Sequence, residues 1–453
     1  MISKVSFSYD PASQVTNILH QLTASATQIN KADYLYNPVG NRTSLTDRRG
    51  SQAFGYDTLD RLTSASHPLL ATPQAFAYDA VGNRMTGGSV VNAGNQLTAD
   101  ATHAYQYDDN GNLTRKTLLA TGNFTQYTYD AENRLTKVED FAAGNPTPAF
   151  TSTYRYDGLG RRIEKIGNGI TRRYIYDGED ILLEYDGSNV LQARYTHGTG
   201  IDEPIAVTKG GSTYFYHQDG LGSVTDLTDS TGATAKSYSY DAYGNIVESP
   251  GTLEQPYTYT GREFDSESGL MYYRARYYDP RTGRFLEKDP LGFVGAGINT
   301  YMYVRNNPAK FTDPKGLEPQ PYVPYPYEYP NDMIGGGEYG TPVCKKGKTW
   351  YWIRPDILND QDDQRCGIVD CLKLHELIHV ADVFATNPTV CQGAPENAKV
   401  SAGSTQQRNQ FEQRGRKLEL DCLTKKLQNP SCGCDQRLTQ RLVEVSVSLG
   451  KYK

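Results

Sequence analysis

A short motif recurs along the first half of the chain: Tyr-Asp, two variable residues, and then Gly-Asn-Arg or a close variant. Between its copies, stretches of alternating polar and apolar residues are bounded by Gly-Asn or Asp-Gly, which is typical of β-hairpins. The copies begin at Tyr36, Tyr56, Tyr78, Tyr107, Tyr129, Tyr156 and Tyr240. One copy is too short to bury a hydrophobic face by itself, so neighbouring hairpins must stack on one another. The motif therefore predicts a repetitive, mainly β fold.

The composition supports this prediction. Of the 453 residues, 35 are Tyr and 43 are Gly, whereas only 13 are Phe and 2 are Trp. Tyr favours strands and Gly favours turns, so we expect many short strands separated by tight turns. The seven cysteines all lie between Cys344 and Cys434, which indicates that the chain has at least two parts of different evolutionary origin.

Charge and hydropathy argue against some classes of protein. The formal net charge is -6, and it belongs to residues 1–317, because residues 318–453 are neutral. This balance argues against a nucleic-acid binder. No apolar run approaches 18 residues, so no membrane span is expected. The N-terminal segment MISKVSFSYD has no long apolar stretch, so the sequence predicts export without an ordinary signal peptide.

Longer segments carry a resemblance to a known family. The YDxxGNR copies resemble the YD (RHS) repeats of bacterial polymorphic toxins and of insecticidal toxin-complex C subunits. The segments Tyr216–Gly232 and Arg274–Leu317 resemble two further regions of that family, and the second is its RHS-associated core. The resemblance covers residues 1–317. It implies a spiral of β-hairpins, made in the bacterial cytoplasm, that forms a hollow shell around a variable C-terminal toxin, with repeats over 1–273 and the core over 274–317.

The resemblance also implies self-cleavage. The family cuts its own chain just after a DPxGL motif, which places the cut here between Leu317 and Glu318. Asp289 and Asp313 match the two carboxylates of its internal aspartyl protease, and Arg284 matches a further position. Two carboxylates that share a proton can activate water and protonate the leaving group. Without the surrounding motif, the two Asp-Pro pairs would indicate turns.

The chain changes in composition after Leu317. Residues 318–330 read EPQPYVPYPYEYP, with five prolines in 13 residues. Such a segment favours extended polyproline II structure and cannot form a helix or a central strand. We therefore expect a stiff linker over 318–343 and a separate domain over 344–453.

The C-terminal domain contains the segment CLKLHELIHVAD at 371–382. On a helix, HExxH places His375 and His379 one turn apart on the same face, which suits two bonds to Zn2+. Glu376 would then lie beside the metal-bound water and act as general base. The alternative is a pair of histidines on an ordinary helix surface.

Catalytic zinc usually has three protein ligands and a water. The C-terminal part holds no other His, so a glutamate on a second helix is the expected third ligand, by resemblance to zincins. The sequence predicts Glu412, with Glu419 as the alternative, because both lie on one face of the helical pattern at 411–423. Asp382 is expected to orient the ring of His379. The predicted domain is small and α-rich, with a zincin-like α+β fold.

The cysteines of this domain have two interpretations. Seven cysteines over so short a stretch indicate disulfides in an exported domain, and free buried thiols are the alternative. They are Cys344, Cys366, Cys371, Cys391, Cys422, Cys432 and Cys434.

These features predict a toxin. We expect the C-terminal domain to act as a zinc metalloendopeptidase on a protein of a competing bacterium or a host cell. The resemblance implies an immunity protein and a secretion or toxin-complex delivery system as partners, and no nucleic acid is expected. Two alternatives stay open: a carrier or surface-interaction protein with an inactive HExxH motif, and a toxin of another chemistry, such as a nuclease or an ADP-ribosyltransferase. The neutral charge of residues 318–453 argues against a nuclease.

Overall fold

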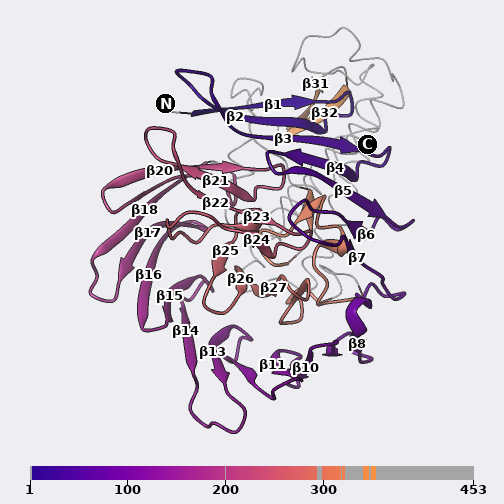
Figure 1. Cartoon of the computed structure of the whole chain (residues 1–453), viewed down its shortest axis with the longest axis vertical. Helices are drawn as coiled ribbons and strands as arrows, with labels where there is room; N and C mark the ends of the chain where they lie inside the picture. Colours follow the sequence, from indigo (N-terminus) through magenta and orange to yellow (C-terminus); the bar gives the residue numbers. More distant parts are fainter. Residues whose placement is uncertain are drawn as a thin grey trace, which may run out of the picture. The chain divides into compact units, whose positions relative to one another are not determined.

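The computed structural model divides the chain into two units, residues 1–325 and 326–453, which we describe separately. The structure describes residues 3–198, 200–292, 298–317, 319–321, 340–345 and 348–353. Within these ranges the first unit is almost entirely β, which confirms the predicted fold class for the repeats and the core (Figure 1). Its described helical elements are three short 3-10 helices, η1 (Thr86–Gly88), η2 (Tyr259–Gly261) and η3 (Val304–Asn306).

The first 75 residues form an antiparallel sheet of seven strands in consecutive order, drawn in indigo in Figure 1. Each strand pairs with its neighbours in the sequence, as short hairpin turns require. The strands are β1 (Ser3–Tyr9), β2 (Val15–Leu22), β3 (Gln28–Tyr36), β4 (Arg42–Asp47), β5 (Gly50–Tyr56), β6 (Leu62–Ala65) and β7 (Gln74–Ala75).

A second antiparallel sheet has fifteen strands, again in consecutive order. The strands are β8 (Val90–Val91), β9 (Leu97–Ala99), β10 (His103–Tyr107), β11 (Leu113–Leu118), β12 (Phe124–Tyr129), β13 (Leu135–Phe141), β14 (Phe150–Tyr156), β15 (Arg162–Gly167), β16 (Ile170–Asp177), β17 (Asp180–Asp186), β18 (Leu191–His197), β19 (Pro204–Lys209), β20 (Ser212–Gln218), β21 (Val224–Thr228) and β22 (Thr234–Ser237). A two-stranded sheet follows, made of β23 (Ser239–Tyr240) and β24 (Ile246–Glu248).

The repeated motif builds the same turn at successive copies. In the copy at Tyr156, a β-bulge interrupts the pairing of β14 with β15 between Arg155 and Tyr156. The Oδ1 atom of Asp157 accepts hydrogen bonds from the backbone N–H groups of Leu159 and Arg161, at 2.9 and 3.0 Å. An aspartate that bonds its own turn in this way fixes the geometry of the connection. Bulges of the same kind precede Tyr36, Tyr56, Tyr107, Tyr129 and Tyr240.

The tyrosine of each motif bonds the backbone of the repeat before it. The hydroxyl of Tyr129 donates to the carbonyl oxygen of Leu113 at 2.9 Å, and that of Tyr78 donates to Leu62 at 2.6 Å. Phe could fill the same space, but it could not make this bond, which explains why Tyr so outnumbers Phe. Similar bonds join Tyr36 to Val15, Tyr56 to Arg42, Tyr156 to Leu135 and Tyr240 to Val224.

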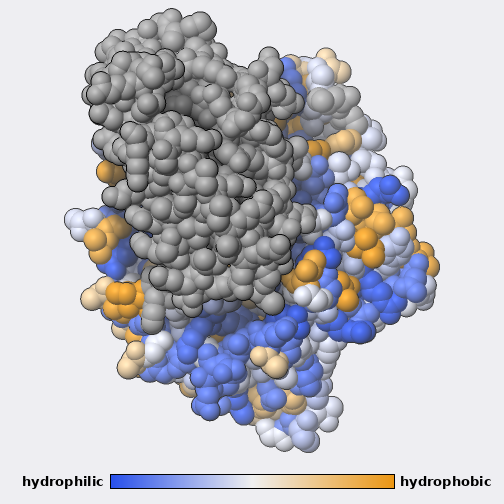
Figure 2. Space-filling view, turned by 180° about the vertical axis from the view of Figure 1, so that it is seen from behind, coloured by the Kyte–Doolittle hydropathy of each residue, from blue (hydrophilic) through white to orange (hydrophobic). Residues whose placement is uncertain are grey.

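Exposed apolar residues occur at the tips of some repeat turns. Leu59 and Leu159 are 69% and 80% exposed. On the described part of the face in Figure 2, hydrophobic side chains are scattered in small groups among hydrophilic ones. Such scattered exposure is ordinary for a protein surface.

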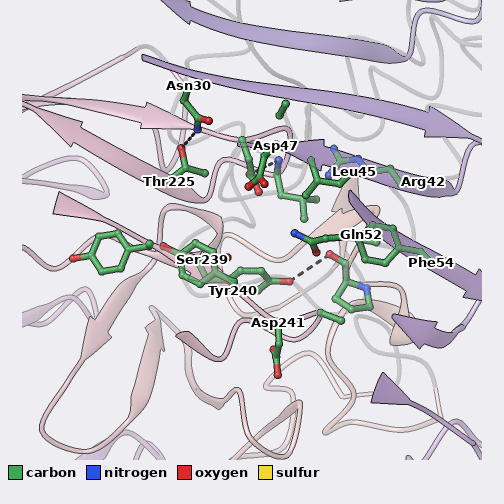
Figure 3. A pocket seen from close by; sticks show the side chains of 18 residues that line it. Asn30, Arg42, Leu45, Asp47, Gln52, Phe54, Thr225, Ser239, Tyr240 and Asp241 are labelled. Carbon is green, nitrogen blue, oxygen red and sulfur yellow. Dashed lines mark hydrogen bonds between the residues drawn. The ribbon is translucent and has the colours of Figure 1, made fainter. Parts of the chain in front are cut away.

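The two large sheets approach each other around a small cavity of about 70 Å³ (Figure 3). Strands β3 to β5 line one side of it and the segment from β21 to β23 lines the other. The lining is partly apolar and partly polar, and Asn30 Nδ2 donates to Thr225 Oγ1 across it at 2.7 Å. Side chains, not paired backbones, therefore connect the sheets here.

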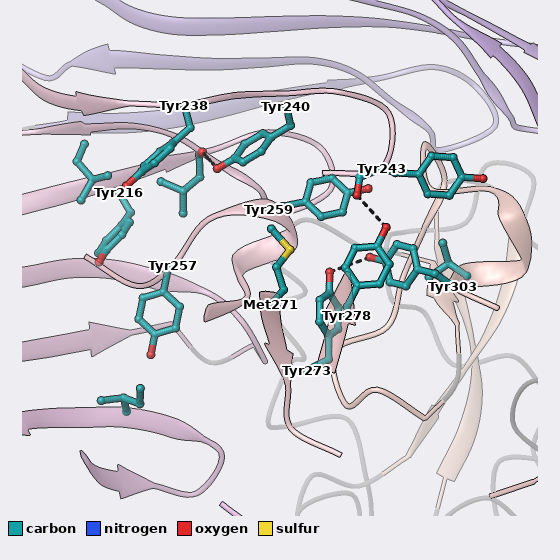
Figure 4. Packing of buried hydrophobic residues seen from close by; sticks show 14 of the residues in the cluster. Tyr216, Tyr238, Tyr240, Tyr243, Tyr257, Tyr259, Met271, Tyr273, Tyr278 and Tyr303 are labelled. Carbon is teal, nitrogen blue, oxygen red and sulfur yellow. Dashed lines mark hydrogen bonds between the residues drawn. The ribbon is translucent and has the colours of Figure 1, made fainter. Parts of the chain in front are cut away.

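The segment from Glu263 to Phe285, which runs into the RHS-associated core, adds a four-stranded antiparallel sheet and contributes to a cluster of buried tyrosines (Figure 4). The rings of Tyr278 and Tyr303 lie 4.3 Å apart between centroids, and the hydroxyl of Tyr273 lies 2.9 Å from that of Tyr303. Rings packed with paired hydroxyls give a dense core without orphaned polar atoms. The strands are β25 (Glu263–Asp265), β26 (Leu270–Tyr273), β27 (Arg276–Asp279) and β28 (Arg284–Phe285).

Two short pairs complete the described structure. In the first unit, β29 (Phe311–Thr312) pairs with β30 (Gln320–Pro321), and in the second unit β31 (Gly340–Lys345) pairs with β32 (Lys348–Ile353). The predicted linker over 318–343 therefore contains β30 and the start of β31. The α-rich domain and its cysteine pairing stay predictions, because the rest of the C-terminal part lies outside the described residues. In the described ranges, no helix has the length and apolar character needed to cross a membrane.

Candidate functional site

The core brings together two aspartates that are distant in the sequence. Asp289 follows β28 and Asp313 follows β29, and they are 3% and 1% exposed. Arg276 at the start of β27 is 2% exposed and lies between them. Its Nη2 atom is 3.0 Å from Asp289 Oδ2 and 3.4 Å from Asp313 Oδ2. One guanidinium nitrogen therefore holds both carboxylates in a single buried cluster.

Backbone contacts fix the arginine and one aspartate. Arg276 Nη1 donates to the carbonyl oxygen of Thr300 at 3.0 Å, and the backbone N–H of Asp289 donates to the same oxygen at 3.0 Å. Burial lowers the pKa of Arg276, and the charges of Asp289 and Asp313 oppose that shift. The nearby carboxyl groups thus favour the charged form of the guanidinium, which burial disfavours.

The second aspartate also holds the turn that ends at the expected cleavage site. Asp313 Oδ1 accepts a hydrogen bond from the backbone N–H of Leu317 at 2.9 Å. Gly316 has φ +66°, and a Cβ atom there would collide with the carbonyl oxygen of Tyr273. Arg276 Nε donates to the Gly316 carbonyl oxygen. Glycine is therefore required at 316, and the turn places Leu317 directly against the carboxylate cluster.

A third buried carboxyl lies in the same cluster, and the sequence analysis did not identify it. Glu287 is 3% exposed, and its Oε2 atom accepts the backbone N–H of Tyr277 at 2.9 Å. Its Oε1 atom is buried with no hydrogen-bond partner among the residues that the structure describes. Burial raises the pKa of Glu287 to about 8, although the Tyr277 N–H and the charge of Arg276 act in the opposite direction. Near neutral pH this carboxyl is protonated, so it adds no third negative charge.

Arg284 contacts the repeats. Its guanidinium donates to Asn83 Oδ1 at 3.1 Å and to the carbonyl oxygen of Asn95, and it lies 5.6 Å from the ring centroid of Tyr301. The structure therefore places Arg276, not Arg284, between the two aspartates. Nothing in the spacing of the many arginines distinguished the two, because the choice depends on how the core folds. A part for Arg284 in cleavage stays a prediction.

The predicted zinc site lies outside the described residues. This holds for His375, Glu376, His379, Asp382, Glu412 and Glu419. In the part of the chain that is described, no group of three or more His, Cys, Asp or Glu is arranged to hold a metal ion.

Two curated relatives place the first unit among bacterial toxins. The tRNA3(Ser)-specific nuclease WapA of Bacillus spizizenii is 38% identical over 280 residues, covering 58% of this chain and 12% of the relative. The double-stranded DNA deaminase toxin A of Burkholderia cenocepacia is 31% identical over 324 residues, covering 63% of this chain and 22% of the relative. The chain thus spans between about an eighth and a quarter of the length of these relatives.

These relatives overturn the prediction of a zinc metalloendopeptidase. One is a nuclease and the other a deaminase, and both have nucleic acid as their target rather than the protein substrate that we expected. The HExxH pattern is only five residues long, so it weighs little against alignments of several hundred residues. The expectation that no nucleic acid is involved loses its support for the same reason.

A crystal structure of TcdB2–TccC3 shares the fold, with a TM-score of 0.50 and 22% sequence identity, over 70% of this chain and 19% of that chain. The sequence matches the teneurin YD-shell family over residues 2–311. The chain therefore belongs to the teneurin YD-shell family.

Proposed function

We propose that the chain is a polymorphic toxin of the RHS type, in which the core cuts the chain after Leu317 and so releases a C-terminal effector. One observation carries the proposal: Arg276 gathers Asp289 and Asp313 beside the turn that ends at Leu317. Burying two carboxylates and a guanidinium is costly, and such clusters are concentrated at functional sites. A purely structural turn needs only one of these aspartates.

The proposed reaction is hydrolysis of the Leu317–Glu318 peptide bond. One aspartate of the pair takes a proton from water, and the water oxygen attacks the carbonyl carbon of Leu317. The other aspartate, protonated at the start, gives its proton to the nitrogen of Glu318 as the C–N bond breaks. Leu317 ends as a carboxyl group, Glu318 ends as an amine, and the pair again holds one proton.

Arg276 is a positioning residue in this scheme. Its two ion pairs hold the carboxylates side by side, and its charge offsets their mutual repulsion. The Leu317 N–H bond to Asp313 keeps the scissile bond within reach of the pair. Protonated Glu287 adds no negative charge beside the two aspartates.

Purification of the Asp313→Asn chain beside the wild type tests the self-cleavage. We expect two polypeptides from the wild type and a single full-length chain from the variant. Asp157→Asn, which changes an exposed repeat turn, is the matched control and should cleave like the wild type. A cleaved Asp313→Asn chain would refute the proposed role of the pair.

The released effector is proposed to act on nucleic acid in a competing cell. The support comes from the curated relatives, one a tRNA nuclease and one a DNA deaminase toxin. Because residues 318–453 are neutral overall, any contacts to phosphates must come from a local group of basic side chains. An immunity protein in the producing cell and a delivery apparatus are the partners that this proposal requires.

Incubation of the purified, cleaved protein with tRNA, duplex DNA and casein tests the effector. We expect shortened or deaminated nucleic acid and intact casein, read by gel and by mass spectrometry. Cleaved casein together with unchanged nucleic acids would contradict the proposal.

Zinc at His375 and His379 stays a prediction from the sequence. Elemental analysis of the purified chain beside His375→Ala tests it. One zinc per chain that is lost in the variant is the expected result, and zinc-free protein in both samples would remove the prediction.

A further inference from the structure

The seven-stranded and fifteen-stranded sheets meet at two histidine rings. His20 on β2 and His217 on β20 are 8% and 1% exposed. The rings lie edge to face, with centroids 5.0 Å apart and planes at 79°, and their Nδ1 atoms are 3.3 Å apart. The two strands belong to different sheets, so side chains and not a strand ladder join them. We call the boundary between the seven-stranded sheet and the segment β20–β23 the seam.

The hydrogen bonds of the two rings define their protonation. His20 Nε2 lies 2.9 Å from the carbonyl oxygen of Gln218, which can only accept, so Nε2 carries the hydrogen. In neutral His20 the Nδ1 atom is then an acceptor, and the hydrogen between the rings belongs to His217 Nδ1. His217 Nε2 in turn accepts from the hydroxyl of Thr228 at 2.9 Å. All four ring nitrogens are satisfied with both rings neutral.

Acid disturbs this arrangement. One added proton puts a positive charge at a buried position, and a second would set two N–H groups against each other across 3.3 Å. The register partner of His217 on β21 is Asp226, whose carboxylate is already bound to Arg48 at 2.8 Å and to the hydroxyl of Ser237 at 2.9 Å. The Oδ1 atom makes both of these contacts, and the Oδ2 atom is buried with no hydrogen-bond partner among the residues that the structure describes.

The other strands around the pair offer no charge to compensate. The register partners of His20 are Val5 on β1 and Asn30 on β3, and neither side chain carries a charge. Asn30 itself bonds Thr225 on β21 at 2.7 Å.

A third histidine bonds across the same seam. His67, which follows β6, is 6% exposed, and its Nε2 atom is 3.0 Å from the hydroxyl of Ser239 on β23. Its Nδ1 atom accepts the backbone N–H of Leu69 at 3.1 Å, so a proton on Nδ1 would break that bond. The charged groups that face it come from both sides of the seam: Asp47, Arg49, Asp241 and Glu248.

Other contacts across the seam include apolar packing, since Leu62 of β6 and Leu227 of β21 belong to one buried cluster, and further polar side-chain bonds. Gly220 N–H donates to the Tyr34 hydroxyl at 2.7 Å, and Gln74 Nε2 donates to Asp241 Oδ2 at 2.8 Å. The small cavity of Figure 3 lies among them. The polar part of this interface, made of side-chain bonds around a cavity, is easier to open than a paired strand ladder.

We propose that His20, His67 and His217 make this seam a latch that is closed near neutral pH and released by acid. Release separates the seven-stranded sheet from β20–β23 and exposes the surface that the two sheets share. The proposal does not depend on the self-cleavage, because the hydrogen bonds of these histidines involve neither aspartate of the cluster nor Arg276.

The direction of the pH dependence follows from the burial of the rings. Burial lowers the pKa values of His20 and His67, and it lowers that of His217 to about 3. In an opened seam the rings regain an ordinary pKa of about 6.5. The closed state is therefore fully favoured above pH 6.5, and each histidine shifts the equilibrium toward the open state by up to about tenfold per pH unit below it.

Amide hydrogen exchange of the full chain, corrected for the intrinsic pH dependence of exchange, tests the latch. Between pH 7.5 and 5.5 we expect exchange in β2 and β20 to accelerate at least tenfold, while β12 and β13, away from the seam, stay unchanged. His217→Gln and His67→Gln should each reduce the acceleration by up to about tenfold. His197→Gln is the matched control, because its Nε2 atom bonds Ile181 inside the fifteen-stranded sheet, and it should behave like the wild type.

Three results would overturn the proposal: no acceleration in the wild type, equal acceleration in all strands, or an acceleration that survives the seam variants. If a seam variant fails to fold, exchange at the imidazole C2 hydrogen of the wild type replaces it, because this reads the pKa of each ring directly. The proposal then requires pKa values below 6.5 for His20, His67 and His217, and an ordinary value for any of them would refute it.

Discussion

The repeat turns and the core both pair aspartate with arginine, yet the two regions use the pair differently. In the turns the partners are four residues apart and partly exposed: the side chains of Arg134 and Asp130 are 28% and 25% exposed. In the core, Arg276 binds Asp289 and Asp313 with side chains that are at most 2% exposed. A local pair shapes a turn, whereas the buried, non-local group is the one that we propose as the cleavage site.

The largest expected effect comes from removing the buried cation. Arg276→Gln leaves two carboxylates uncompensated, so we expect a loss of about 3–5 kcal/mol in the free energy of unfolding together with loss of self-cleavage. Arg134→Gln, the matched change in a turn, should cost about 0.5 kcal/mol and leave cleavage intact. Urea unfolding and gel analysis of the two variants check this, and equal losses would remove the contrast between the regions.

The next effect concerns two glycines that both have a positive φ angle but different surroundings. Gly316→Ala puts a Cβ atom onto the Tyr273 carbonyl oxygen and displaces the turn that holds Leu317. We expect cleavage to slow by about a hundredfold. Gly160→Ala is the control, because Gly160 has φ +81° but nothing lies within 4 Å of its Cβ position. Similar cleavage rates for both variants, followed after synthesis in vitro, would show that the turn at 316 does not position the bond.

Glu287 gives the core a pH dependence opposite in direction to that of the turn aspartates Asp130 and Asp157, whose pKa values lie below the ordinary value. Its pKa is raised to about 8 in the folded protein from an ordinary value near 4.5, so the folded state retains a proton that the unfolded state has lost. Its contribution to stability is complete below about pH 4.5 and is lost as pH rises towards 8, by about 1 kcal/mol per unit. Glu287→Gln should flatten this slope. An unchanged slope of the free energy of unfolding between pH 5 and 8 would contradict the assignment.

The smallest effect tests the repeat bond itself. Tyr129→Phe keeps the ring but removes the 2.9 Å bond to the Leu113 carbonyl oxygen. We expect a loss of about 1 kcal/mol, measured by urea unfolding, with cleavage unaffected. A loss of cleavage would contradict this, because it would mean that a single hydrogen bond in the repeats controls the reaction in the core.

The difference between local contacts in the turns and non-local contacts in the core also explains which features could be predicted from the sequence. The strands, the turns and the role of aspartate in them follow from a motif seven residues long, and the structure confirms them at Tyr36, Tyr129 and Tyr156. Asp289 and Asp313 were identified because a long segment resembles a known core.

Arg276 and Glu287 could not be predicted, because their role depends on contacts between residues 10 to 37 positions apart that only the folded core creates. The peptidase prediction rested on a five-residue motif and was wrong for a related reason. A short pattern indicates a possible chemistry, whereas the relatives indicate which chemistry the family of toxins uses.

The mass of the fragments from the purified wild-type chain tests the central claim most directly. We predict two species that end at Leu317 and begin at Glu318, the second with the N-terminal sequence EPQPY, and a single intact species from Asp289→Asn. An intact wild-type chain, a cut at another bond, or a cleaved Asp289→Asn chain would contradict the account.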